Sequence, residues 1–174
     1  QEPRPDREIW TDHTDARPTM MTILGLHDDY SSDGAAIAQI IGSDESRRGD
    51  DALPWSIRAN ERGYEQLAAA YKQLDAPFGE FGLGTLDADT TALATGSSSS
   101  DASYTDTTSQ LQACENQRTA LVSQIQPVIE AAENGTVPVS SWEASSLIGR
   151  ADRLIGDAKF LAGASTPPRV TVCS

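Results

Sequence analysis

The sequence predicts an all-α fold of about four helices, with a long antiparallel helical hairpin at the C-terminal end and an irregular N-terminal arm. Two observations support this prediction. Apolar residues recur at intervals of three and four in several separate segments, which is the spacing of one face of an α-helix. Residues that start and stop helices lie at the borders of these segments.

The first two helices are expected within residues 31–77, as a two-helix unit. The first spans about residues 31–43, with Ser31 or Ser32 as its N-cap and Gly42 at its end. Its apolar stripe contains Ala36, Ile37, Ile40 and Ile41. The second spans about residues 56–75 and ends before Pro77. Its apolar stripe contains Tyr64, Leu67, Ala68, Tyr71 and Leu74.

Residues 104–174 are expected to form the helical hairpin and an extended tail. The first hairpin helix spans about residues 105–133, and Pro127 inside it is expected to kink or divide it. Asn134-Gly135 is a helix stop. The second helix runs to about Gly163 and starts at a capping box formed by Ser140 and Glu143. The two apolar stripes contain Leu111, Cys114, Leu121, Ile125, Val128 and Ala132, and then Leu147, Ala151, Leu154, Ala158 and Leu161.

Two segments lack a helical pattern. Residues 1–30 contain three prolines and one apolar run, residues 20–26, whose length does not distinguish a strand from a helical turn. We expect an irregular N-terminal arm there. Residues 78–103 contain several glycines and a run of serines, a composition typical of a flexible connection. We expect this second segment to pack little against the rest of the chain.

The chain contains two cysteines, Cys114 and Cys173. The second hairpin helix returns the chain toward the start of the first, so we expect these cysteines to form a disulfide; two unrelated free thiols are the alternative. A disulfide in an acidic chain rich in Ser and Thr is typical of an oxidising compartment. The chain begins at Gln1 and not at Met, which indicates either a processed product or a trimmed chain. We therefore expect an extracytoplasmic protein: secreted, periplasmic or associated with the cell envelope.

Acidic residues outnumber basic ones by 26 to 13, which gives a formal net charge of -13. This balance argues against nucleic-acid binding, which requires a basic face against the phosphates. It also argues against a polybasic membrane anchor. No apolar run approaches the roughly 20 residues that a transmembrane helix needs. We expect a protein partner, no nucleic acid and no transmembrane segment in this chain.

Both histidines lie in the N-terminal third, close in sequence to several aspartates. His13, His27, Asp29 and Asp33 are the candidate ligands for zinc or another divalent metal. Their spacing matches no metal-ligand motif. Solvent-exposed loop residues are therefore the competing interpretation, and the one that we favour.

Two acidic segments are candidates for calcium binding. Residues 29–34 resemble the first half of an EF-hand calcium loop, with oxygen ligands at loop positions 1, 3 and 5 and glycine at position 6. Position 12 is Ile40, where such a loop needs a bidentate carboxylate. Residues 86–91 form a second acidic cluster, without a glycine turn. We expect no cofactor, with calcium or another divalent metal as the weaker alternative.

The sequence carries no pattern for nucleophilic catalysis or phosphate binding. We therefore favour a non-enzymatic interaction or accessory protein, such as a subunit of a larger extracytoplasmic complex. Trp10, Met20 and Met21 are the candidate partner contacts, because Trp and Met are enriched at protein interfaces. Core filling is the competing role of Trp10 and Trp55, and Trp142 is expected to cover the hairpin. The alternative function is a metal-dependent hydrolase that uses the N-terminal His and Asp residues.

Overall fold

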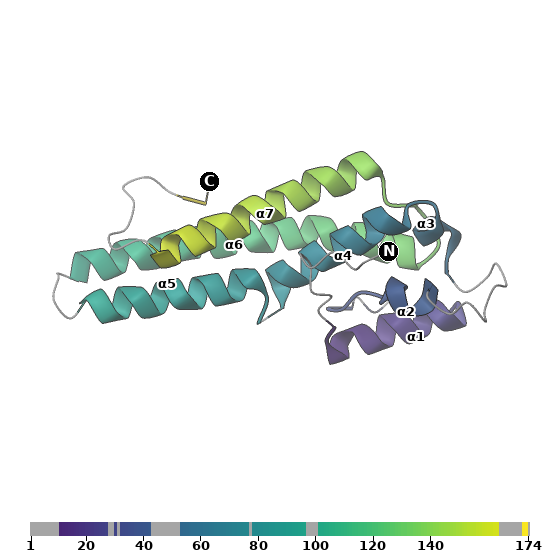
Figure 1. The fold of residues 1–174 in the computed structure, drawn as a ribbon, viewed down its shortest axis with the longest axis horizontal. Helices are drawn as coiled ribbons and strands as arrows, with labels where there is room; N and C mark the ends of the chain where they lie inside the picture. The colour runs from purple at the N-terminus through teal and green to yellow at the C-terminus, as the bar shows by residue number, and fades with distance from the viewer. Residues whose placement is uncertain are drawn as a thin grey trace, which may run out of the picture. The chain divides into compact units, whose positions relative to one another are not determined.

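A computed structural model describes residues 11–27, 30, 32–42, 53–76, 78–96, 101–163 and 172–173 (Figure 1). The described elements are η1 (His13–Asp15), α1 (Ala16–Leu24), α2 (Ala38–Gly42), α3 (Trp55–Arg58), α4 (Glu61–Asp75), α5 (Glu80–Gly96), α6 (Asp101–Glu133) and α7 (Ser141–Gly163). No strand occurs among the residues in these ranges. The prediction of an all-α fold is confirmed.

The chain divides into two compact units. The first unit contains Gln1–Ala69 and Pro127–Ala144, and the second contains Ala70–Gln126 and Ser145–Ser174. Helices α4, α6 and α7 each contribute residues to both units. The borders between the units therefore fall inside helices.

The first unit combines the short N-terminal helices with the first part of α4 and the last turns of α6. Its buried apolar side chains include Ala35, Ala36, Ile41, Ile57, Tyr64, Leu67, Ile129, Ala132 and Val139. Helix α1 ends at Gly25, whose φ of 63° lies in the left-handed region that favours glycine. Helix α6 ends just before Gly135, which has a φ of 69°. The predicted helix stop at Asn134-Gly135 is therefore confirmed.

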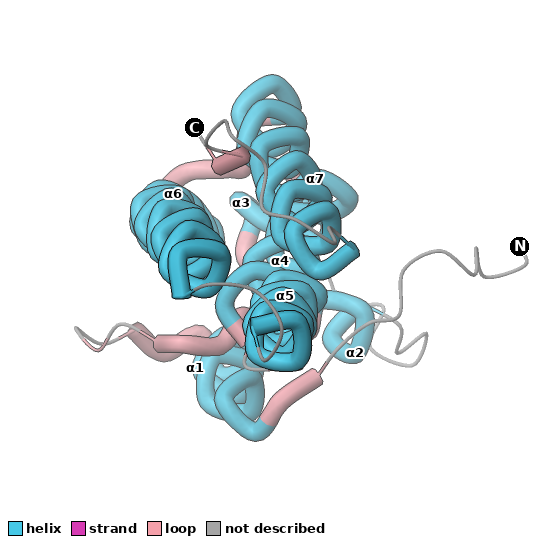
Figure 2. Tube along the Cα trace, turned by 90° about the vertical axis from the view of Figure 1, so that its left-hand side faces the viewer, coloured by secondary structure: helices cyan, strands magenta, loops and turns pink. Residues whose placement is uncertain are grey.

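In the second unit, α5 runs alongside the longer parts of α6 and α7 (Figures 1 and 2). The core of this unit includes Leu74, Phe81, Ala88, Leu111, Leu121, Ile125, Leu147, Ala151, Leu154, Ala158 and Leu161. Among the described residues, ion pairs link the helices of this unit. Lys159 Nζ lies 2.6 Å from Glu80 Oε2, and Arg118 Nη1 lies 2.7 Å from Asp75 Oδ1. The stripes predicted for α6 and α7 supply most of this core.

The prediction of a flexible connection over residues 78–103 is wrong for Glu80–Gly96, which form α5. One side of α5 is buried, with Phe81, Gly84, Ala88 and Ala92 spaced by three or four residues. A Cβ atom on Gly84 would lie 3.3 Å from the Cβ of Ala158 on α7. Gly84 therefore permits close packing of two helices, and its presence does not signal a flexible chain.

The irregular N-terminal arm predicted for residues 1–30 is also wrong in its described part, because η1 and α1 occupy residues 13–24. Pro18 lies in the first turn of α1, where a missing N–H group is tolerated. The helix predicted over residues 31–43 is confined to α2. Residues 34–37 stay non-helical because several of their N–H groups are bonded to side chains of the first unit.

Two further differences concern the longer helices. The helix predicted over residues 56–75 is broken into α3 and α4, because Asn60 Oδ1 accepts the N–H of Gly63 at 3.2 Å and caps α4. Helix α6 continues through Pro127, so this proline does not divide it. A hairpin of α6 and α7 as an element of its own stays a prediction.

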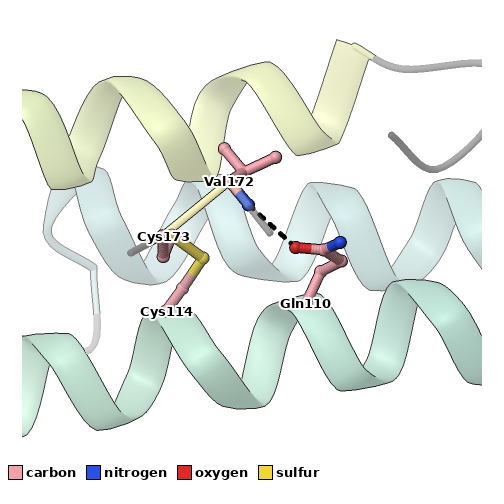
Figure 3. The surroundings of a disulfide bond; sticks show 4 residues. All are labelled: Gln110, Cys114, Val172 and Cys173. Atoms are coloured by element: carbon pink, nitrogen blue, oxygen red, sulfur yellow. Dashed lines mark hydrogen bonds between the residues drawn. A yellow bond between two sulfur atoms is a disulfide. The ribbon is translucent and has the colours of Figure 1, made fainter. Parts of the chain in front are cut away.

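The structure joins Cys114 of α6 to Cys173 by a disulfide, as predicted (Figure 3). The Cα atoms of the two cysteines lie 4.9 Å apart, and the cysteines are separated by 59 residues in the sequence. Both side chains are buried. The N–H of Val172 donates to Gln110 Oε1 at 3.0 Å, one turn of α6 away from Cys114. The C-terminal end is thus held against α6 by one covalent bond and one hydrogen bond.

Candidate functional site

Helix α1 turns polar side chains into the first unit and leaves apolar side chains outside. Its buried side chains are Pro18, Thr19 and Thr22. The outer face of α1, as we name it, consists of the exposed side chains Met20, Ile23, Leu24 and, just after the helix, Leu26. Met20 is 58 % exposed and Leu24 is 65 % exposed. A surface helix normally shows the opposite arrangement, with its apolar stripe on the core.

Hydrogen bonds to residues 34–37 explain why the polar side of α1 faces inward. Thr19 Oγ1 donates to the backbone oxygen of Asp15 at 2.7 Å and accepts the N–H of Ile37 at 3.0 Å. The buried carboxylate of Asp15 accepts the N–H of Ala35 at 3.0 Å. Buried polar groups need such partners, so rotating α1 to bury its apolar side chains would leave several of these groups unpaired.

A pocket of about 190 Å³, which we name the α1 pocket, adjoins the outer face within the first unit. The α1 side of this pocket is lined by Arg17, Met21, Leu26, His27 and Tyr30, and the end of α6 contributes Glu130, Glu133 and Asn134. The guanidinium carbon of Arg17 lies 4.4 Å from the centroid of the Tyr30 ring, a cation–π distance. His27 Nδ1 and Asn134 Oδ1 form a hydrogen bond of 3.1 Å. Leu26 belongs to both the outer face of α1 and the α1 pocket, so the two form one continuous surface.

Glu133 is the most perturbed carboxyl group in the α1 pocket. Its Oε1 atom accepts the N–H of Ala36 and the O–H of Tyr64, each at 2.6 Å. Burial raises the pKa of Glu133 to about 6, against the lowering effect of these two hydrogen bonds, and the charges of Glu130 and Asp15 add to the increase. Burial, together with the charge of Glu133, also raises the pKa of Tyr64 well above its usual value.

This raised pKa predicts a pH-dependent stability difference between the wild type and the Glu133→Gln variant. Above pH 6, Glu133 is ionised in both the folded and the unfolded protein. Its carboxylate is better solvated in the unfolded chain, which lowers the free energy of unfolding. Below the ordinary pKa of 4.5, the group is protonated in both states. The free energy of unfolding of the wild type, relative to Glu133→Gln, should therefore fall by about 2 kcal/mol between about pH 4 and pH 7.5.

Urea unfolding of both proteins at the two pH values measures this difference. The comparison with the variant cancels the contributions of the other titratable groups, which both proteins share. A difference that stays constant with pH would show that burial does not raise the pKa of Glu133.

The candidate metal ligands are not brought together. His13 is exposed and contacts Asp12, His27 lies in the α1 pocket, and Asp33 is exposed. Asp29 lies outside the described residues. Among the described residues, no group of three or more His, Cys, Asp or Glu side chains is arranged to hold a metal ion.

The two candidate calcium segments differ from each other in structure. Residues 86–91 are part of helix α5, so their carboxylates do not lie in a loop that wraps around an ion. In the segment 29–34, Gly34 packs against the backbone of Thr14, and residues 29 and 31 lie outside the described residues.

The candidate partner contacts are partly described. Met20 lies on the outer face of α1, Met21 lines the α1 pocket, and Trp10 lies outside the described residues. The prediction that Trp142 packs as a cover is wrong, since this side chain is 81 % exposed. Trp55 is exposed as well, and its Nε1 donates to the backbone oxygen of Gly135 at 2.6 Å.

Sequence reasoning missed Ile23, Leu24, Leu26 and Glu133. The apolar run at residues 20–26 was a visible signal for the first three, but the side of the helix that faces solvent depends on the bonds of Asp15 and Thr19. The residues next to Glu133 in the sequence do not indicate its place in the site, because its hydrogen-bond partners, Ala36 and Tyr64, are far away in the sequence.

A second cavity, of about 290 Å³, lies in the second unit beside Cys173, between α6 and α7. Two arginines line it. Arg150 Nη1 donates to Gln124 Oε1 at 2.7 Å, and the charge of Arg153 opposes the burial that raises the pKa of Asp157. These arginines already interact with neighbouring side chains, so this cavity is a weaker candidate site than the α1 pocket.

The chain matches no family model, no curated protein and no solved structure. Within the described ranges, no helix combines the length and the apolar character that crossing a membrane requires. The candidate site is therefore the outer face of α1 with its adjoining pocket, identified from the geometry of this chain.

Proposed function

We propose that this chain is a non-enzymatic extracytoplasmic interaction protein that binds a protein partner through the outer face of α1. The inverted orientation of α1 is the observation that supports this proposal. Four apolar side chains are exposed there, while the threonines of the same helix are buried. Contiguous exposed apolar groups on a soluble protein are typical of interaction surfaces.

The chemistry of this face suits a protein interface. Methionine and large aliphatic side chains exclude water when a partner covers them, and burial of apolar area contributes about 25 cal/mol per Å². The net charge of -13 favours encounter with a basic partner surface, mainly by increasing the association rate.

The compartment is proposed from the disulfide. Cys114 and Cys173 are paired and buried, and structural disulfides of this kind are common in secreted, periplasmic and envelope proteins. The metal-dependent hydrolase that His13 and His27 suggested gains no supporting observation among the described residues.

Affinity capture with matched variants tests the proposal. The double variant Met20→Gln, Leu24→Gln keeps good helix formers at both positions and should recover at least about tenfold less partner from envelope or medium fractions than the wild type. The matched control is Leu86→Gln on α5, because Leu86 is similarly exposed, at 61 %, and lies outside the candidate site.

Quantitative mass spectrometry of the captured proteins gives the readout, with circular dichroism to verify that each variant is folded. The control should recover the same partner in the same amount as the wild type. Equal recovery by the α1 double variant and the wild type would move the search for the interface away from α1.

A further inference from the structure

We propose that the cavity beside Cys173 binds a small organic molecule that carries one carboxylate group. This cavity, which we name the disulfide cavity, has a volume of about 290 Å³ and lies between α6 and α7. All of its described lining residues belong to the second unit. The proposal therefore does not depend on the partner that we propose for α1, and it rests on the walls, the size and the charge of this second site.

The disulfide gives the cavity a fixed wall. Cys173 lines the cavity and is held against α6 by its bond to Cys114 (Figure 3). Leu121 of α6 and Leu154 of α7 also line it, and both are buried. The volume of about 290 Å³ is close to the roughly 300 Å³ at which pockets for small molecules usually begin. The cavity therefore suits a small ligand whose short apolar part lies against the two leucines.

Arg150 supplies hydrogen-bond donors for the charged end of such a ligand. Its Nη1 atom donates to Gln124 Oε1 at 2.7 Å, which uses one of the several N–H groups of the guanidinium. Gln124 is neutral, so this bond positions Arg150 at the cavity without neutralising its charge. A guanidinium that is positioned in this way can bind a carboxylate through two parallel hydrogen bonds.

The charge of the lining favours a single carboxylate. Arg150, Arg153 and Asp157 are the charged side chains among the described lining residues, so one positive charge is left over. Arg153 and Asp157 lie four residues apart on α7 and attract each other. On a chain with a net charge of -13, this positive charge is a local feature of the cavity. One carboxylate balances it, whereas a phosphate monoester carries nearly two negative charges at pH 7.

Titration of the full, disulfide-bonded chain with n-butyrate tests the proposal. Butyrate should shift the amide NMR signals of Leu121 and Gly156 in a saturable way, with a dissociation constant of about 10 mM or tighter. Butyramide, which has nearly the same shape without the charge, should give no saturable shift at the same concentrations. n-Butyl phosphate should bind more weakly than butyrate, because the lining does not balance its additional charge.

The variant Gly156→Leu blocks the cavity without changing a charge. Gly156 lines the cavity, and nothing lies within 4 Å of a Cβ atom at this position. Leucine is also a better helix former than glycine, so the variant should fold while its side chain occupies space that the ligand needs. Butyrate binding should weaken at least about tenfold. The matched control is Gly149→Leu, which also meets nothing within 4 Å of its Cβ, lies on the same helix and should bind butyrate as the wild type does.

The variant Arg150→Gln identifies the group that binds the carboxylate. Glutamine keeps a good helix former at this position, and circular dichroism verifies that the variant is folded. Its affinity for butyrate should fall at least about tenfold, because the charge-assisted hydrogen bonds are lost. Arg62→Gln is the matched control, because it removes the same charge from an exposed position on α4 in the first unit. This control should leave butyrate binding unchanged.

The proposal is wrong if butyrate gives no saturable shift, if butyramide binds equally well, or if Arg150→Gln or Gly156→Leu binds butyrate as the wild type does. Tighter binding of n-butyl phosphate than of butyrate would overturn the assignment of a carboxylate. The double variant Met20→Gln, Leu24→Gln should bind butyrate normally, since its disulfide cavity is intact. Failure of the outer face of α1 and failure of the disulfide cavity are therefore distinguished by separate measurements.

Discussion

Replacing Cys173 by serine is expected to lower the free energy of unfolding by about 4 kcal/mol, the largest single effect that the structure predicts. The disulfide closes a loop between positions 59 residues apart, and in the chain-entropy model a loop of this length restricts the unfolded chain by about that amount. The substitution leaves Cys114 in the core, so most of the loss comes from the broken bond. Urea unfolding, followed by far-UV circular dichroism, measures the change.

Reduced wild-type protein is the control for this variant. It should lose nearly the same free energy as Cys173→Ser, because both lack the same cross-link. The mass of the native protein should also be lower than that of the reduced protein by two hydrogens. A loss below about 1 kcal/mol in the variant would show that the bond does little to restrict the unfolded chain.

Alanine at Gly34 is expected to destabilise the protein by about 3 kcal/mol. A Cβ atom at this position would lie 2.3 Å from the backbone oxygen of Thr14 and 2.6 Å from the backbone nitrogen of Asp15. Backbone atoms do not move aside as the end of a flexible side chain does. Residues 34–37 would have to shift, and the bonds from Ala35 and Ala36 to the carboxylates of Asp15 and Glu133 would be strained.

The matched control is Gly149→Ala on α7. Nothing lies within 4 Å of a Cβ atom at that glycine, and alanine is the better helix former by about 1 kcal/mol. The control should therefore be neutral or more stable in thermal and urea unfolding. If both variants lose similar stability, the close approach at Gly34 is not the cause.

The periodic parts of the fold were predictable, because helical spacing and caps are local properties of a sequence. The stripes of α6 and α7 predicted buried residues such as Leu121 and Leu154. The capping box at the start of α7 is present in part, since the N–H of Glu143 donates to Ser140 Oγ at 3.3 Å. The pairing of Cys114 with Cys173 followed from the expected return of the chain.

The remaining features depend on contacts between residues far apart in the sequence. Gly84 looks like a sign of flexibility until Ala158 is placed against it. The orientation of α1 is set by the bond between Thr19 and Ile37, and the carboxylate of Glu133 accepts the N–H of Ala36, 97 positions away. Local pattern predicts that a helix forms, but here such distant bonds decide which of its sides faces water.

Because the outer face of α1 is apolar, the tendency of the protein to self-associate depends on ionic strength. The net charge of -13 keeps molecules that lack a partner apart by mutual repulsion. That repulsion reaches about 10 Å at 0.1 M salt and only about 3 Å at 1 M salt, whereas attraction between exposed apolar groups is not screened. Concentrated protein without its partner is therefore best dispersed in dilute buffer, and added salt brings it closer to its solubility limit.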